Sequence, residues 1–246
     1  MEWPIPSYTH IPLIHSDTGT KLSKRDGVLS ITEYRQLGYI ANAVINYLLR
    51  LGWSHGDKEY FTKQEMIDYF DIKQIHKSPA RLDFKKLTNM NSVYLKDMDE
   101  ELLVEYILNR AGMATEVDSK LKLNTIIPHL KTKSKNLNEI YELGIFLLPN
   151  QTIEIEDDLK ALFTDEINNL ISDFSKQISQ LDDWSHSSIE AIFATFLSNY
   201  NIKLIDIAKP LRIILTGRIV PTGIYEILLA LGKDETINRI SNYIAK

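Results

Sequence analysis

A short basic loop near the start of the chain contains residue types that bind phosphate. Lys21, Lys24 and Arg25 lie within five residues of one another, and glycines occupy positions 19 and 27. Glycine permits backbone conformations that other residues avoid. Ammonium and guanidinium groups supply the charge and the hydrogen-bond donors that a polyphosphate requires. The loop therefore indicates a phosphate site, although most basic runs of this length are solvated surface.

Two further basic clusters have the composition of nucleic-acid contacts. Between positions 119 and 138 the chain has five lysines and no acidic residue, a local charge of +5 in a chain of net charge −5. Nearer the C-terminus, Lys209, Arg212 and Arg218 surround a Leu-Thr-Gly turn at positions 215–217. Clustered cations of this kind fit contacts with RNA phosphates. Each cluster also has an interpretation without RNA. The first could be a solvated helix end, and Arg212 could form an ion pair on a helix surface.

Helices are the elements that must position these clusters. Apolar residues recur at helical spacing over most of the chain, which predicts amphipathic helices. Capping boxes, with a short polar residue three positions before a glutamate, predict helix starts at Ser30, Thr62 and Asp97. Pro210 is expected at a helix start, where its missing N–H would have no partner. Strand signals are confined to the first twenty residues and to positions 94–95, so we predict an all-α protein with a short irregular head.

Composition excludes several classes of protein. Hydrophobic residues make up 44% of the chain and charged residues 25%, as in ordinary globular proteins. No apolar run approaches the roughly 18 residues that would cross a bilayer, so we expect no membrane association. Without cysteine there are no disulfides or thiolate metal ligands, which fits a cytoplasmic location. The six histidines are scattered, and we expect no zinc site.

Several segments together resemble a known family. Positions 10–13 (His-Ile-Pro-Leu) and the loop at 19–27 (GTKLSKRDG) are similar to the second signature loop of class I aminoacyl-tRNA synthetases. The KLSKR form is typical of the glutamyl enzymes and their glutaminyl relatives. Residues 51–53, 84–91 and 210–217 are similar to stretches of the bacterial glutamyl enzymes, in the same order. The resemblance covers nearly the whole chain and is weakest between about 121 and 185.

The resemblance implies a role for the basic loop. In the family this loop lies against ATP, expected with Mg²⁺, while glutamate attacks the α-phosphorus to form glutamyl-adenylate. Lys24 matches the lysine that would contact the phosphates, and we assign it as the catalytic residue. Lys21, Ser23 and Arg25 are expected to bind ATP with it. The nucleotide fold that precedes this loop in the family is missing here, so the 246-residue chain is expected to be a C-terminal portion that is inactive alone.

The resemblance also implies contacts with tRNA. Lys133 aligns with an arginine that reads the anticodon in some relatives, but lysine lacks the planar fork that such reading uses. Residues expected to contact RNA are Lys133, Lys135, Lys209, Arg212, Arg218 and Thr222. Here proline precedes Thr222, whereas relatives place threonine first, which puts the local backbone in doubt. Lys85 and Lys86 are candidates for contacts with the tRNA backbone.

The expected organisation has four parts. They are residues 1–30, the tail of the catalytic domain with the KLSKR loop; 31–97, a helical block that contacts the tRNA stem; and 98–150 and 151–246, two anticodon-binding helical subdomains. The expected partners are tRNA(Glu), with glutamate and ATP for the full-length enzyme, and a monomer is expected. Two alternatives stay open: an enzyme that charges tRNA(Gln) with glutamate, and a non-catalytic helical protein that binds RNA or acts as a scaffold.

Overall fold

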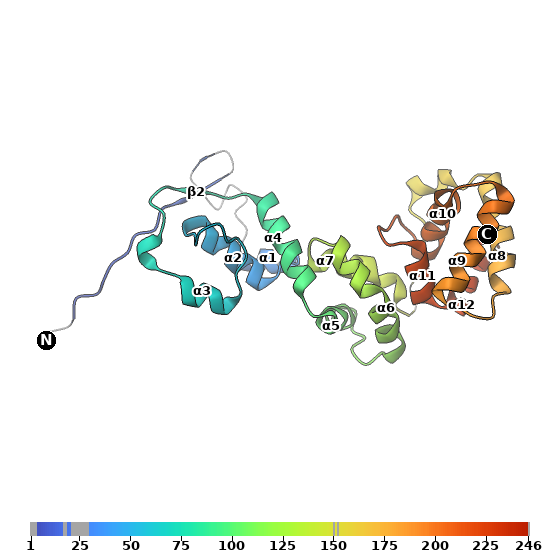
Figure 1. Ribbon diagram of the computed structural model, residues 1–246, viewed down its shortest axis with the longest axis horizontal. Helices are drawn as coiled ribbons and strands as arrows, with labels where there is room; N and C mark the ends of the chain where they lie inside the picture. Colours follow the sequence, from blue (N-terminus) through green and yellow to red (C-terminus); the bar gives the residue numbers. More distant parts are fainter. Residues whose placement is uncertain (1–3, 17–18, 21–29, 150, 152, 246) are drawn as a thin grey trace. The chain divides into compact units, whose positions relative to one another are not determined.

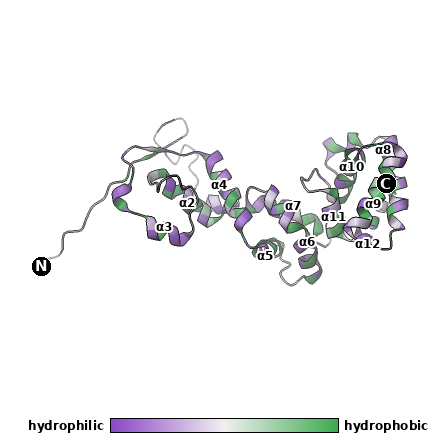
Figure 2. Cartoon of the chain, in the orientation of Figure 1, coloured by the Kyte–Doolittle hydropathy of each residue, from purple (hydrophilic) through white to green (hydrophobic). Residues whose placement is uncertain are grey.

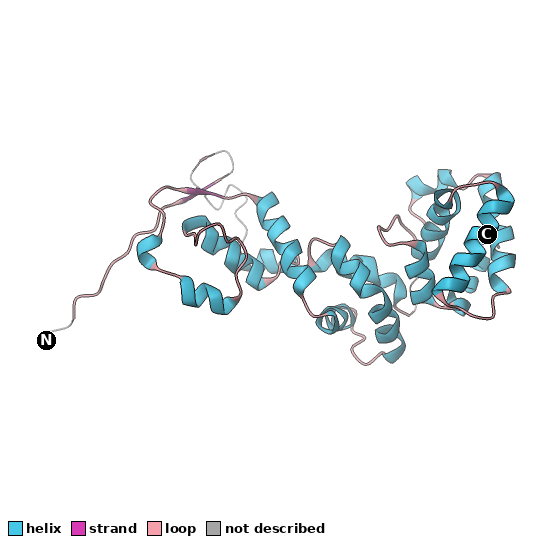
Figure 3. Ribbon diagram, viewed as in Figure 1, coloured by secondary structure: helices cyan, strands magenta, loops and turns pink. Residues whose placement is uncertain are grey.

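The computed structural model describes residues 4–16, 19–20, 30–149, 151 and 153–245. Within these ranges nearly all regular structure is helical, and each of the two strands is two residues long (Figures 1 and 3). The all-α prediction is confirmed. The chain divides into two compact units, which hold Met1–Met98 with Ser134–Glu139, and Asp99–Lys133 with Ile140–Lys246. In both units the helices carry hydrophobic residues on part of their surface and hydrophilic residues elsewhere (Figure 2).

The first unit is built around two helices, α2 (Ala41–Gly52) and α4 (Phe84–Asp97), that pack together, with shorter helices and strands before and between them. The shorter elements are β1 (Ile14–His15), α1 (Ile31–Gln36), α3 (Lys63–Tyr69), the 3₁₀ helix η1 (Ile72–Gln74) and β2 (Ala80–Arg81). The strands β1 and β2 pair in parallel. Helices α2 and α4 pack together, and Tyr47, Leu87 and Met90 are buried in one core cluster. Trp53 is 1% exposed in a second cluster, with Phe61 and Met66.

The second unit contains most of the remaining helices. They are α5 (Glu100–Arg110), α6 (Val117–Lys133), η2 (Ile145–Leu147), η3 (Asp157–Leu162), α8 (Asp165–Ser179), α9 (His186–Tyr200), α10 (Leu204–Thr216), α11 (Ile224–Leu231) and α12 (Lys233–Ile244). Helix α7 (Leu137–Gly144) begins in the first unit and ends in the second. Phe174 of α8 meets Phe193 and Phe196 of α9, with ring centroids 4.6 and 5.2 Å apart. The face of α9 that carries Ile189, Phe193 and Phe196 is therefore buried in the core.

Local capping predictions agree with the structure at two helices and fail at a third. Ser30 and Thr62 form complete capping boxes with the glutamates three residues later. The predicted box at Asp97 is wrong, because α4 continues through Asp97. The cap of α5 is instead Asp99, whose Oδ1 accepts a hydrogen bond from the Glu101 N–H at 2.7 Å.

Two other expectations are also corrected. Positions 94–95 lie within α4 and not in a strand, because Leu95 is on the buried face of that helix. Pro210 lies inside α10 and not at its start, since the helix begins at Leu204. A proline in a helix interior costs about 3 kcal/mol. Packing offsets this cost, because most of α10, including Ile207 and Leu211, is buried.

Gly38 lies where another part of the first unit approaches the backbone closely. Its φ is +78°, and a Cβ there would lie 2.6 Å from the backbone nitrogen of Asn138. Gly56 also has a positive φ, of +53°, but its Cβ would meet nothing within 4 Å. We expect Gly38→Ala to lower the free energy of unfolding by about 1–3 kcal/mol more than Gly56→Ala, because only Gly38→Ala adds a clash to the strain. Urea unfolding of both variants measures the difference, and equal losses would contradict the expectation.

Candidate nucleic-acid interface

The turn between α10 and α11 is held against another segment of the second unit. Helix α10 ends at Thr216 and is capped by Gly217, whose φ of +81° suits only glycine without strain. A Cβ at this position would lie 2.7 Å from the carbonyl oxygen of Glu154. The N–H of Glu156 donates to the Gly217 carbonyl at 3.2 Å. Gly217 therefore fixes the start of the turn, because the Cβ of any other residue would collide with the Glu154 carbonyl.

Arg212 fixes the same turn from inside α10. Its Nε donates to the Ala208 carbonyl at 3.3 Å, and its Nη1 lies 3.4 Å from both the Val220 and the Thr222 carbonyls. The Oγ1 of Thr216 donates to the Arg212 carbonyl at 2.8 Å. Part of the guanidinium thus shapes residues 217–222, while the Arg212 side chain stays partly exposed.

The other residues predicted in this cluster differ in exposure. Lys209 is half-buried on α10, one helical turn before Arg212. The Nη1 of Arg218 lies 3.3 Å from Oε2 of Glu142, and the arginine side chain is 36% exposed. Thr222 is 2% exposed, and its Oγ1 has no hydrogen-bond partner among the described residues. Ile219 at the tip of the turn is 56% exposed, and sequence reasoning passed over it.

The lysine-rich segment presents less charge than its composition indicates. Three of its lysines pair with carboxylates: Lys120 with Glu101 at 2.9 Å, Lys122 with Asp118 at 2.7 Å and Lys131 with Glu100 at 3.1 Å. The hydrogen bond that Lys120 donates to Glu101 also raises the pKa of Lys120. Lys133, the last residue of α6, and Lys135 are both exposed. These two lysines are therefore the cations of the segment that the structure presents to solvent.

Comparison with known proteins assigns these parts to a family. Residues 100–244 match the anticodon binding domain family, and residues 1–89 match the family of tRNA synthetases class I (E and Q), catalytic domain. The glutamate–tRNA ligase of Rhodopseudomonas palustris is 39% identical over 254 residues, covering 100% of this chain and 54% of the relative. That of Nitrobacter winogradskyi is 41% identical over 249 residues, covering 98% and 52%.

Solved structures of glutamate–tRNA ligases are also similar to this chain. The crystal structure of a glutamate tRNA ligase from Elizabethkingia meningosepticum, in complex with its amino acid, matches 99% of this chain with a TM-score of 0.81 and 28% identity. The glutamate-tRNA synthetase of Elizabethkingia anophelis matches with a TM-score of 0.78 and 26% identity. Each match covers 52% of the solved chain.

The chain belongs to the anticodon binding domain family. Over nearly its whole length it is also similar to glutamate–tRNA ligases. It spans about half the length of the curated relatives it matches.

Most of the predicted signature loop lies outside the described residues. Lys21, Ser23, Lys24 and Arg25 all fall in that stretch, so their assignment stays a prediction. Gly19, just before it, is described. A Cβ on Gly19 would lie 3.3 Å from Nη2 of Arg81 on β2. Arg81 is thus an exposed cation beside the start of the loop, brought there by the β1–β2 pairing and not detectable from its sequence neighbours.

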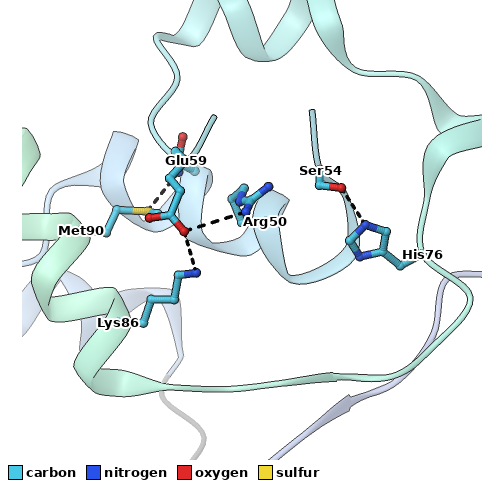
Figure 4. A network of polar contacts seen from close by, with 7 residues as sticks. Arg50, Ser54, Glu59, His76, Lys86 and Met90 are labelled. Carbon is cyan, nitrogen blue, oxygen red and sulfur yellow. Dashed lines mark hydrogen bonds and ion pairs between the residues drawn. The ribbon is translucent and has the colours of Figure 1, made fainter. Parts of the chain in front are cut away.

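In the helical block at 31–97, a carboxylate contacts one of the two lysines predicted to meet the tRNA backbone. Figure 4 shows Glu59 between Lys86 and Arg50, with its Oε1 3.1 Å from Lys86 Nζ and 3.9 Å from Arg50 Nη2. Lys85 is exposed, and no ion pair to it is found among the described residues. Of the pair, Lys85 is therefore the better placed for a phosphate contact.

Two residues near Arg218 were missed by the sequence analysis. The guanidinium carbon of Arg110, at the end of α5, lies 4.3 Å from the ring centroid of Tyr141. Tyr141 precedes Glu142, the residue that contacts Arg218. Unstacked RNA bases stack on aromatic rings and on guanidinium planes, so this pair is a candidate base contact. No local pattern identifies this pair, because its members are about thirty positions apart in the sequence.

Membrane-spanning helices and metal-binding clusters are both absent from the described part of the chain. No helix there is long and apolar enough to cross a membrane. The described residues also contain no group of three or more histidine, aspartate or glutamate side chains arranged to hold a metal ion.

Proposed function

We propose that this chain recognises tRNA as part of an enzyme that attaches glutamate to tRNA(Glu). The observation that carries the proposal is the α10–α11 turn, which Arg212 and Gly217 hold in place within the region matched by the anticodon-binding family. An anticodon loop offers unstacked bases, which are read by edges and faces that meet fixed donors and apolar surfaces. A turn that is already ordered pays less conformational entropy when RNA binds.

The structure supports separate roles for the residues of this turn. Arg218 and Lys209 offer partly exposed cations for phosphates, while Arg212 offers the unengaged part of its guanidinium. Ile219 offers an exposed apolar side chain to a base. Thr222 is buried, so we propose that it acts through the shape of the turn and not through direct contact. Lys133 and Lys135 offer exposed cations for further phosphate contacts.

For the whole protein we propose the reaction of the relatives named glutamate–tRNA ligase. Glutamate would attack the α-phosphorus of ATP, forming glutamyl-adenylate and releasing pyrophosphate. The terminal adenosine hydroxyl of tRNA would then take the glutamyl group and release AMP. Lys24 would stabilise negative charge on the phosphates, as positioned cations do in phosphoryl chemistry. Lys21, Ser23 and Arg25 would hold ATP with it, and Mg²⁺ would accompany the nucleotide.

The remaining assignments belong to the same proposal. The divisions at residues 30, 97 and 150, a monomeric state and a cytoplasmic location are all proposed. Charging of tRNA(Gln) with glutamate is the second candidate specificity, and the relatives that match this chain do not separate it from the first. A non-catalytic RNA-binding role is the candidate from another class.

A binding titration tests tRNA recognition by this chain. Glutamate and glutamine tRNAs, each with intact and substituted anticodons, are titrated by fluorescence anisotropy at 50, 100 and 200 mM KCl. We expect weak binding that falls with salt, because phosphate contacts release counterions. We also expect tighter binding of the intact glutamate anticodon. Affinity that is indifferent to both tRNA identity and anticodon would contradict the proposal, and equal affinity for both intact tRNAs would favour the broader specificity.

A further inference from the structure

A buried amide in the first unit holds the backbone of one of the exposed lysines. Asn91, on α4, is 0% exposed. Its Oδ1 accepts from the N–H of Ile40 at 2.8 Å, and its Nδ2 donates to the carbonyl of Lys135 at 2.6 Å. Both ends of the amide therefore bind backbone groups, which lie 51 and 44 residues away in the sequence.

The backbone around Lys135 is held at several other points within the same unit. The N–H of Lys135 donates to Oε2 of Glu139 at 2.7 Å. The N–H of Leu137 donates to the Gly38 carbonyl at 2.9 Å, and Nδ2 of Asn138 donates to the Gln36 carbonyl at 2.8 Å. Both peptide groups of Lys135 are thus engaged, while its side chain is exposed.

This arrangement goes beyond what packing requires. Burying an amide is costly unless its hydrogen bonds are satisfied, so an apolar side chain would fill the same volume at less risk. The amide of Asn91 gains its partners only when residues 134–139 lie against α4 and the start of α2. A lysine on a fixed backbone loses less freedom when it meets a phosphate than one on a mobile loop.

We infer that Asn91 is a positioning residue for RNA binding, which fixes Lys135 so that its ammonium group meets an RNA phosphate. The inference rests on the proposed tRNA recognition. Asn91 itself touches no RNA; it acts through the carbonyl of Lys135.

A double-mutant cycle with a matched control tests this role. Asn46 on α2 is also 0% exposed, and its amide also binds two backbone groups, the Glu59 carbonyl at 2.8 Å and the Phe61 N–H at 2.9 Å. It does not bind the 134–139 segment in the contacts described. Binding of tRNA(Glu) is measured against salt for wild type, Lys135→Ala, Asn91→Ala, Asn91→Asp, the Asn91→Ala/Lys135→Ala double variant and Asn46→Ala, at a temperature where circular dichroism shows each folded.

We expect the Asn91 and Lys135 variants to lose the same part of the binding affinity, so that the two losses do not add. Lys135→Ala lowers affinity roughly three- to fivefold near 150 mM salt and reduces the slope of log K against log salt by about 0.7–0.9, as one phosphate contact would. Asn91→Ala and Asn91→Asp reproduce much of both changes, because neither offers an amide donor to the Lys135 carbonyl. The double variant loses little more than Lys135→Ala. Asn46→Ala lowers stability but leaves the slope unchanged.

Other results separate the inference from the proposed function. Additive losses in the double variant, an equal slope change in Asn46→Ala, or full affinity in Lys135→Ala would each overturn the positioning role. If binding ignores the anticodon while the coupling between Asn91 and Lys135 persists, the proposed anticodon recognition fails and the positioning role stands.

Discussion

Replacing Arg239 with methionine is expected to destabilise the second unit by about 3 kcal/mol, since each of two buried carbonyls would lose its donor at a cost of roughly 1–3 kcal/mol. The Arg239 side chain is 9% exposed. Its Nη1 donates to the Leu215 carbonyl at 2.6 Å and its Nη2 to the Phe146 carbonyl at 2.8 Å. Methionine fills a similar volume but offers no donor, so the loss reports the hydrogen bonds more than the packing.

These contacts tie the C-terminal helix to the end of α10. Leu215 is in the last turn of α10, where carbonyls have no partner within the helix. Arg239 on α12 satisfies this one, and its Nε also donates to Oε1 of Glu235 at 2.6 Å. Glu235 is 36% exposed, so solvent screens that ion pair and the carbonyl contacts carry most of the effect.

Hydrogen exchange resolves the two units separately, which makes it the suitable measurement. Amides of α10 and α12 should lose protection in Arg239→Met, while those of α2 and α4 should be unchanged. The control is Lys176→Met, which removes an exposed lysine that pairs with Asp173 three residues away on the same helix. That pair is solvated and should contribute little. Equal protection of α10 in both variants would show that the carbonyls find other donors.

Replacing Arg212 with alanine is expected to weaken binding of tRNA with an intact anticodon by about tenfold or more, which corresponds to about 1.4 kcal/mol. Two losses combine. The carbonyls of Val220 and Thr222 lose the donor that orders the turn, and the RNA loses a partly exposed guanidinium. Lysine keeps the charge but lacks the planar fork, so Arg212→Lys should lose nearly as much discrimination between anticodons as Arg212→Ala.

The two contributions of Arg212 can be measured apart. Hydrogen exchange of residues 219–223 without RNA reports the order of the turn, and it should increase in both variants. The affinity ratio between intact and substituted anticodons reports recognition. Lys176→Ala serves as the control, since that lysine lies on α8 and should change neither reading. A turn of unchanged protection with a lost affinity ratio would assign Arg212 to base contact alone, whereas unchanged values of both would remove it from the site.

Local signals were sufficient for much of the fold. Ser30 and Thr62 were found because a capping box is a contact between residues three apart, which the sequence displays directly. The prediction at Asp97 was wrong because both Asp97 and Asp99 could cap α5. Only the extent of α4, which continues through Asp97, decides between them. Pro210 misled because proline's local preference for a first turn is weaker than the burial of the helix around it.

The candidate site shows a similar division. Composition identified the cations at 119–138 and at 209–218, and the resemblance of the signature loop identified the family before any contact was known. The partners of those cations were not accessible in the same way. Glu100 and Glu101 neutralise lysines up to thirty-one positions away, and nothing in the lysine-rich segment itself indicates this. Ranking its five lysines therefore required the structure.

The sequence by itself determined the helical class, the helix starts at Ser30 and Thr62, the supply of cations and the family to which the chain belongs. These follow from short-range periodicity, caps and motifs, which involve residues a few positions apart. Only the tertiary structure decided that Arg212 binds the carbonyls of its own turn, that Thr222 is buried, and that Asn91 holds Lys135. The physical reason is that the groups satisfying a buried or charged atom are chosen by the packing of distant segments. A pattern read along the chain records that such an atom exists, but not which partner it finds.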